Sequence, residues 1–481
     1  MSVLNNFTVS VAKGLRRLRQ KQELREVVPN ASRRKGNTAV PEETKLNMEK
    51  CLIVSKVTRY EYERHSHEHL SECELERVLR KRGSDYDSML KIHKQQKAFE
   101  ENVAKSLRDM GLKVEMASRL TYNDDIINWC DVVVPCGGDG TFLLAASRVR
   151  DANKPVIGFN SSPQKSVGRL CLPTWCSNDV KGAFQAIKEG RFRWMRRSRI
   201  RTTVTSEPQL LETITPVDLH TLHYCRYPPV QNTHEMVDAY NMNSRQVATT
   251  ARDAPVSPTL ATKVLPFLAL NEVRILYYNM NSRQVATTAR DAPVSPTLAT
   301  KVLPFLALNE VFIGESVTSR VSLLRLQIDN GAWSHTKSSG LCVTTGTGST
   351  SWHFSINCLR TQSVQELMKI LHEEYKVPLD TAMEKAREVT EKYNQKLMFA
   401  ADSDQLAYSV REYITFEEWP TPRGLKVRDK ASSVKVKSHC TDAGLVIDGS
   451  VSFPFNDGTE AILEIHPEDS LMTVQMDEKR P

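Results

Sequence analysis

The 481-residue sequence predicts an N-terminal α/β domain with a doubly wound, Rossmann-like parallel sheet, followed by a mainly β C-terminal domain. Two observations support this prediction. In residues 46–190, short β-branched apolar runs alternate with helix-forming runs, which is typical of a parallel sheet covered by helices. In residues 191–474, short strand-like runs follow one another, and one helical insertion at 364–397 interrupts them.

The apolar runs place the elements of the first domain in order. Strands are expected at 51–57, 112–116, 132–134 and 154–159, and helices at 59–82, 88–110, 124–129 and 141–149. Strands of the second domain are expected at 192–204, 321–328, 340–344, 407–410, 434–436, 445–447 and 461–465. The two inserted helices should break near Pro378. Arginines alternate with other residues from 191 to 202, and we expect a solvated strand face there. A phosphate-binding arginine from this set is the alternative.

Composition excludes several classes of protein. The chain is 40% hydrophobic and 25% charged, which is ordinary for a soluble globular protein. No apolar run approaches the roughly 20 residues of a membrane span, so no membrane partner is expected. The ten cysteines form no CxxC pair, which favours reduced, mostly buried thiols. His65, His67 and His69 alternate but stand among charged residues, so no protein-built metal site is predicted there.

The net charge of +8 is concentrated at the N-terminus. Residues 1–36 hold nine Lys or Arg against two Glu, which leaves the remaining residues with a net charge of only +1. The body is therefore not basic enough to predict nucleic-acid binding. Apolar residues of this arm fall roughly on one helical face beside basic ones, which predicts a mitochondrial transit peptide and linker over 1–45. A disordered basic tail is the alternative.

A glycine-rich turn provides the main evidence for a catalytic site. Gly137, Gly138 and Gly140 follow the expected strand at 132–134 and precede a helix, and glycines there can take backbone angles closed to other residues. The N–H groups and positive dipole end of the helix favour phosphate. Asp139 in the turn would repel phosphate unless it binds Mg²⁺ or accepts a hydrogen bond from a substrate hydroxyl, which predicts a kinase-like site. A tight turn with Asp as helix cap is the alternative.

The turn 137–141 resembles the signature shared by NAD kinases, diacylglycerol and sphingosine kinases, and phosphofructokinases. Two further segments, 309–315 and 344–352, resemble the Asn-Glu and Thr-Gly-Ser motifs of the NAD kinase family, in the family's order. Segments 59–63, 168–173, 192–194 and 453–458 resemble its mitochondrial members in animals. The resemblance implies a phosphofructokinase/lipid-kinase-like fold and transfer of the ATP γ-phosphoryl group to the 2′-hydroxyl of the adenosine ribose of NAD. It also implies Mg²⁺ bound with ATP, a homodimer and the mitochondrial matrix.

The candidate site residues follow from the three motifs. Asp139 is the catalytic candidate, which would orient the acceptor hydroxyl, take its proton, or coordinate the metal through water. Asn309 and Glu310 fit hydrogen bonding to NAD. The remaining candidates would bind phosphate or nucleotide: Gly137, Gly138, Gly140, Thr141, Thr347, Gly348, Ser349, Thr350, Ser351 and Ser355. The chain departs from the family pattern at Ser339, where bacterial members have an acid, and at Gly346 and Trp352, where they have proline and tyrosine.

An exact repeat complicates the second domain. Residues 240–273 recur without change as 278–311, so the Asn-Glu motif occurs twice, at Asn271-Glu272 and at Asn309-Glu310. Structural repeats diverge, and identity over this length indicates a recent duplication or a misassembled gene. We expect the second copy to be functional, because only it continues into a β-rich segment. Two alternatives to an NAD kinase remain: a related lipid kinase, or a catalytically dead nucleotide-binding product of the duplication.

Overall fold

The computed structural model describes residues 48–119, 121–164, 166–219, 298–414 and 425–477. The expected transit peptide and the first copy of the repeat, with Asn271 and Glu272, lie outside the described residues. Within the described part, no helix combines the length and the apolar character needed to cross a bilayer. The nine described cysteines are all free thiols.

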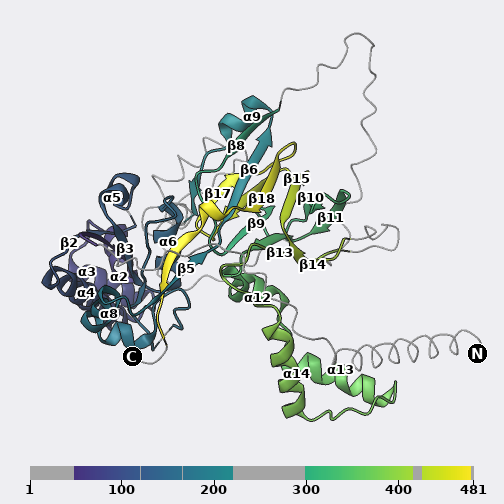
Figure 1. Ribbon diagram of the computed structural model, residues 1–481, viewed down its shortest axis with the longest axis horizontal. Coiled ribbons are helices and arrows are strands. Elements are labelled where there is room, and N and C mark those ends of the chain that lie inside the picture. Colours follow the sequence, from purple (N-terminus) through teal and green to yellow (C-terminus); the bar gives the residue numbers. More distant parts are fainter. Residues whose placement is uncertain (1–47, 120, 165, 220–297, 415–424, 478–481) are drawn as a thin grey trace, which may run out of the picture. The chain divides into compact units, whose positions relative to one another are not determined.

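The first part of the chain forms a parallel sheet with the strand order β2-β1-β3-β4 (Figure 1). Its strands are β1 (Lys50–Ser55), β2 (Lys113–Ala117), β3 (Val132–Gly137) and β4 (Phe159–Asn160). Its helices are α2 (Arg59–Ser66), α3 (Glu72–Lys81), α4 (Tyr86–Asp109), α5 (Asp124–Trp129), α6 (Asp139–Arg148), α7 (Thr174–Asn178) and α8 (Val180–Lys188). The parallel pairing confirms the predicted α/β class.

Neighbouring residues of the central strands pack into two separate cores. Ile53 and Val134 belong to a buried cluster with residues of α4 and α8. Leu52 and Val133, one position earlier, belong to a second cluster with residues of α5 and α6. Because successive side chains of a strand point to opposite faces, helices cover both faces of this sheet. The unbroken apolar runs at 51–54 and 132–134 are therefore buried throughout.

Two elements differ from the sequence prediction. The helix expected over 59–82 is divided into α2 and α3, because Ser71 and Glu74 form a capping box that starts a new helix. The strand expected over 154–159 shrinks to β4, preceded by an isolated bridge at Val156. Pro155 lacks the N–H that a central strand position would donate, which explains the interruption.

The second part contains two antiparallel sheets, in the orders β11-β10-β15-β18-β6-β8 and β14-β13-β12-β9-β16-β17-β7. The strands are β6 (Ile200–Ser206), β7 (Val217–Asp218), β8 (Ala299–Val302), β9 (Glu310–Glu315), β10 (Ser322–Ile328), β11 (Ser334–Ser338), β12 (Gly340–Thr344), β13 (Leu406–Arg411), β14 (Arg428–Ala431), β15 (Ser433–Ser438), β16 (Ala443–Ile447), β17 (Val451–Pro454) and β18 (Glu460–Ile465). The helices are α9 (Pro208–Thr213), α12 (Trp352–Asn357), α13 (Thr361–Glu373) and α14 (Met383–Gln395). One buried apolar cluster draws on strands of both sheets, and the predicted β class is confirmed.

The last strand returns to the first part of the chain. β19 (Leu471–Gln475) pairs antiparallel with β5 (Arg193–Arg197), and Thr473 forms a parallel bridge with Val156. Trp175 Nε1 also donates to the carbonyl of Asp477, at 2.9 Å. Residues near the C-terminus thus complete the packing around the parallel sheet.

The prediction of one solvated arginine strand over 192–204 is wrong. The segment forms β5 and β6, which belong to different sheets, and Arg199 between them is fully buried. Arg199 donates to the carbonyls of Asp469, Ala146 and Val149, the last two at the end of α6. Carbonyls at a helix C-terminus lack partners within the helix and carry partial negative charge, so they can accept a buried cation. Burial lowers the pKa of Arg199 to about 10.

Candidate active site

The glycine-rich turn connects β3 to α6, as the sequence predicts. β3 ends at Gly137, Gly138 caps α6 without a side-chain hydrogen bond, and Asp139 is the first helical residue. The N–H groups of Asp139 and Gly140 donate to no group among the described residues. They lie at the positive end of the α6 dipole, where an anion such as phosphate is stabilised.

The glycines of the turn do not require positive φ angles, contrary to expectation. None of Gly137, Gly138 and Gly140 has a positive φ, and Gly138 has φ −96°. Gly137 is required for space instead, because a Cβ there would lie 2.2 Å from Thr141 Oγ1. A Cβ on Gly140 would meet nothing within 4 Å. Gly140 therefore leaves an open surface at the helix start.

Both carboxylate oxygens of Asp139 accept main-chain hydrogen bonds. The N–H groups of Arg169 and Leu170 donate to it at 3.1 and 2.9 Å. These residues follow Gly168, which has φ +61°, a conformation that favours glycine. Asp139 thus holds the 168–170 loop against the turn. A carboxylate has about four acceptor positions, so two stay available for a substrate hydroxyl or a metal-bound water.

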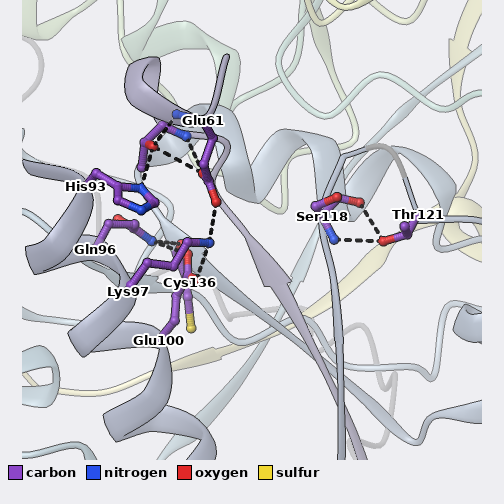
Figure 2. Close-up of polar contacts among 9 residues, drawn as sticks. Glu61, His93, Gln96, Lys97, Glu100, Ser118, Thr121 and Cys136 are labelled. Atoms are coloured by element: carbon purple, nitrogen blue, oxygen red, sulfur yellow. Dashed lines mark hydrogen bonds and ion pairs between the residues drawn. The ribbon is translucent and has the colours of Figure 1, made fainter. Parts of the chain in front are cut away.

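A partly buried polar network contacts Cys136, the residue before Gly137 (Figure 2). Gln96 Nε2 donates to the carbonyl of Cys136 at 3.0 Å and to Glu100 Oε1 at 2.7 Å. Lys97 Nζ bridges Glu100 Oε2 at 3.1 Å and Glu61 Oε1 at 2.6 Å. The network links α2 and α4 to the residue just before Gly137. Sequence reasoning missed it, although Thr58-x-x-Glu61 is the signature of the capping box that positions Glu61.

The Asn-Glu motif opens the central strand β9, whose six residues are all buried. The carboxylate of Asp448 accepts from the N–H groups of Leu308, Asn309 and Glu310, at 2.8, 2.8 and 3.1 Å. Burial raises the pKa of Asp448 to about 6 despite these donors. Asp448 was not predicted, because it lies 139 residues from Asn309 along the chain. Its neighbour Gly449, with φ +63°, marks only a turn.

Glu310 is buried without a full set of partners. Its side chain is 8% exposed, and Oε2 has no hydrogen-bond partner among the described residues. Burial, with the charge of Asp448 adding to it, raises the pKa of Glu310 to about 8. Buried acids with strongly raised pKa values are concentrated at functional sites. Glu310 therefore has the character of a ligand-binding group.

Hydroxyls of the Thr-Gly-Ser segment divide into two groups. Ser349 is fully buried, and its Oγ donates to the carbonyl of Gly346 and accepts from the N–H of Phe399. Thr350 Oγ1 donates back to the carbonyl of Thr347, and exposed Ser355 donates back to that of Ser351 at 3.4 Å. These hydroxyls hold the segment's own backbone.

The hydroxyls of Ser351 and Thr347 connect different parts of the site. Ser351 Oγ accepts from Asn309 Nδ2 at 3.3 Å, which joins the segment to the Asn-Glu motif. Thr347 Oγ1 accepts from Arg197 Nη1 at 3.3 Å. The structure therefore brings Asn309 and Ser351 together, and it adds Arg197, which the sequence assigned to a solvated face.

The departures from the family pattern have local explanations. A Cβ at Gly346 would lie 1.7 Å from the carbonyl oxygen of Ala400, so this chain has no room for proline there. Trp352 packs on Phe312, with ring centroids 4.7 Å apart, and stays 37% exposed. Ser339, which stands in place of the acid, donates its hydroxyl hydrogen to Glu412.

Alanine substitutions at Gly348 and Gly140 should distinguish a tightly packed glycine from an exposed one by their effects on stability. We expect Gly348→Ala to cost several kcal/mol, because its Cβ would lie 2.1 Å from the Asn309 carbonyl oxygen. Gly140→Ala should leave the stability equal or raise it by about 0.5–1 kcal/mol, since alanine is favoured over glycine in a helix. Thermal unfolding measures both. Equal losses of Tm in the two variants would contradict the packing described for Gly348.

Comparisons with known proteins agree with the motifs. Residues 35–165 match the family model of the ATP-NAD kinase N-terminal domain. The chain is 34% identical to the Rattus norvegicus protein "NAD kinase 2, mitochondrial" over 434 residues, which cover 89% of this chain and 88% of the rat protein. It is 35% identical to the Homo sapiens protein of the same name over 431 residues, 89% of this chain and 84% of the human protein.

A solved structure, an NAD kinase from Archaeoglobus fulgidus in complex with ATP, aligns with 89% of this chain and 94% of its own at 13% identity and a TM-score of 0.41. The similarity to the rat and human proteins is much stronger and extends over nearly nine-tenths of each chain. On this similarity, the chain belongs to the NAD kinase family.

Proposed function

We propose that this chain transfers the γ-phosphoryl group of ATP to the 2′-hydroxyl of the adenosine ribose of NAD, making NADP in the mitochondrial matrix. One structural observation carries the proposal. Three motifs far apart in the sequence lie together: a hydrogen bond joins Asn309 to Ser351, another joins Arg197 to Thr347, and the charge of Asp139 acts on Arg197. The similarity to proteins named mitochondrial NAD kinase 2 supports the reaction and the compartment.

The residues would divide the work of phosphoryl transfer, which depends mainly on positioning and charge stabilisation. The free N–H groups of Asp139 and Gly140 would bind phosphate oxygens, with Gly137 and Gly138 allowing close approach. The Asp139 carboxylate would accept the hydrogen of the ribose hydroxyl and take its proton late in the transfer. Glu310 would accept a hydrogen bond from an NAD hydroxyl, and Ser351 would fix the amide of Asn309.

Mg²⁺ would bind together with ATP. The described residues contain no cluster of three or more His, Cys, Asp or Glu that could hold a metal ion. The phosphates would therefore supply most of its ligands, with Asp139 as the protein carboxylate at the turn. When bound, the ion would offset the negative charge of the phosphates.

The direct test incubates purified protein with ATP, Mg²⁺ and NAD and measures NADP. NADP formation is expected. Diacylglycerol or sphingosine phosphorylated in place of NAD would support the lipid-kinase alternative instead. Nucleotide binding without any turnover would support the catalytically dead alternative. Light scattering on the same sample tests the proposed homodimer.

Excision of the first repeat copy should not harm activity. Asn309 and Glu310 of the second copy lead directly into β9, between β12 and β16 of the seven-stranded sheet. Deleting residues 240–277 removes one copy, and long surface insertions change closure entropy little. We expect NADP formation equal to or above that of the full chain. A deletion variant that folds but is inactive would contradict the assignment of the second copy.

The basic arm should direct import. We expect a fluorescent fusion of residues 1–36 to enter mitochondria, because the arm is acid-poor and amphipathic. A matched fusion in which Arg16, Arg17 and Arg19 are replaced by Glu should stay in the cytosol. Cytosolic fluorescence from the unaltered arm would contradict the transit-peptide prediction.

A further inference from the structure

Arg197 is partly buried and forms no ion pair with a carboxylate among the described residues. Arg197 ends β5, and its Nε is buried without a hydrogen-bond partner among the described residues. Its single hydrogen bond to another side chain goes to a neutral hydroxyl, Thr347 Oγ1. By contrast, Arg193 and Arg201 of the same stretch each form an ion pair.

An enclosed charge without a counter-ion is costly. Removing an ammonium- or guanidinium-sized ion from water costs several kcal/mol even after relaxation, and proteins normally offset this with a paired charge. Burial lowers the pKa of Arg197, and the charge of Asp139 acts in the opposite direction. Among the described residues Arg197 forms no ion pair, and the charge of Asp139 acts on it without one.

The surroundings of Arg197 identify where the missing anion belongs. Thr347 is part of the Thr-Gly-Ser segment, and Asp139 starts α6. Cys171, which is also near Arg197, lies at the glycine turn, since its Sγ donates to the carbonyl of Gly137 at 3.8 Å. Arg197 thus lies beside both segments that the proposed function assigns to nucleotide binding.

We propose that Arg197 is a phosphate-binding residue that pairs with oxyanions of the bound nucleotide and thereby joins the glycine turn to the Thr-Gly-Ser segment. The planar fork of N–H donors in arginine matches two oxygens of one phosphate. The proposal rests on the proposed function for the identity of the nucleotide, but not for the oxyanion chemistry itself. ATP and NAD both carry such groups, so the test must distinguish them.

Two neighbouring arginines provide the contrast. Arg199 is also buried, but three carbonyls accept its hydrogen bonds, so its role is to hold the end of α6. Arg196 is exposed and donates to the carbonyl of Ala152 and to Asn153 Oδ1. Arg196→Met therefore serves as the matched control for loss of one positive charge on β5.

Titration calorimetry on the full chain tests the proposal with tripolyphosphate, ATP, NAD and adenosine as probes. Arg197→Met should weaken tripolyphosphate binding about 10- to 100-fold, the loss expected for a charged hydrogen bond. Arg197→Lys should restore part of this affinity, because it keeps the charge and loses the fork. Adenosine affinity should be unchanged, and the Tm of Arg197→Met should be equal or higher, since an unpaired buried charge is removed. Arg196→Met should bind all four probes like the wild type.

The affinities for ATP and NAD show which of the two nucleotides supplies the oxyanion. A loss for ATP but not NAD assigns Arg197 to the triphosphate, and the reverse assigns it to the NAD pyrophosphate. Unchanged affinity for all three anions, or an equal loss for adenosine, would overturn the proposal. If the wild type makes no NADP but Arg197→Met still weakens tripolyphosphate binding, the proposed reaction is refuted and the oxyanion site is supported. Failure of the wild type to bind any of the three anions would refute both.

Discussion

Asp139→Asn should lower NADP formation about 10²- to 10⁴-fold, which is the contribution of a positioned general base. The substitution keeps the side-chain size but removes the charge and the proton acceptor. It should also reduce stability by roughly 1–3 kcal/mol, because the new amide NH₂ would face one of the N–H donors of Arg169 and Leu170. Steady-state kinetics and thermal unfolding measure the two effects separately.

Asp131→Asn is the control for the loss of a carboxylate charge that accepts main-chain N–H groups. Asp131 Oδ2 accepts the N–H groups of Glu49 and Lys50 at 3.0 and 2.9 Å, just before β3 begins. Because one oxygen of Asp131 accepts both donors, its asparagine variant can keep both hydrogen bonds, so it should lose less stability than Asp139→Asn and keep its activity. If Asp139→Asn kept more than about a tenth of the wild-type rate, both the general-base role and the metal role of Asp139 would be wrong.

Glu310→Gln should stabilise the protein at alkaline pH while impairing NAD binding. The pKa of Glu310 in the folded chain, about 8, lies above its value of about 4.3 in an unfolded chain. Its protonated form therefore favours folding at low pH, and this contribution is lost as the pH rises through about 8. Glutamine stays neutral, so the gain in unfolding free energy over wild type should be absent near pH 4 and reach roughly 5 kcal/mol above pH 8.

The same carboxylate should control the KM for NAD. An ionised Glu310 is the better acceptor for a ribose hydroxyl, so the KM of the wild type should fall as the pH rises through about 8. Glu310→Ala should raise the KM roughly 10- to 100-fold or stop turnover. Glu315→Gln, on the same strand, and Glu272→Ala, in the first repeat copy, should leave the KM unchanged. A damaging Glu272→Ala would show that the wrong copy was assigned to the site.

Local patterns predicted the elements that carry the chemistry. The strand, turn and helix around Asp139 follow from an apolar run, a glycine cluster and a helix-forming run, and all three occur as expected. The break of the inserted helices near Pro378 is also confirmed. β11 was missed, because its sequence Ser-His-Thr-Lys-Ser contains no apolar residue and is held by pairing with β10.

The long-range partners of the site had no local signal. Period two along 191–202 shows which arginines share a face, but it does not show whether that face meets water or another element. Arg197 and Arg199 meet other elements, so their exposure was predicted wrongly. Asp448 accepts hydrogen bonds from the N–H groups before and at the start of β9, although it lies far along the chain. The sequence around a single acid in a turn does not predict such a long-range contact.

The return of the last strand sets an order for folding. Trp175 donates to a carbonyl 302 residues later in the chain, and Val156 forms a bridge with Thr473. A nascent chain cannot form these pairings until its end has left the ribosome, so the N-terminal part stays incomplete throughout synthesis. Contacts of such high sequence separation also slow folding. Deleting β19 would remove the strand partner of β5 and the bridge to Val156, so a change near the end of the chain should destabilise its first half.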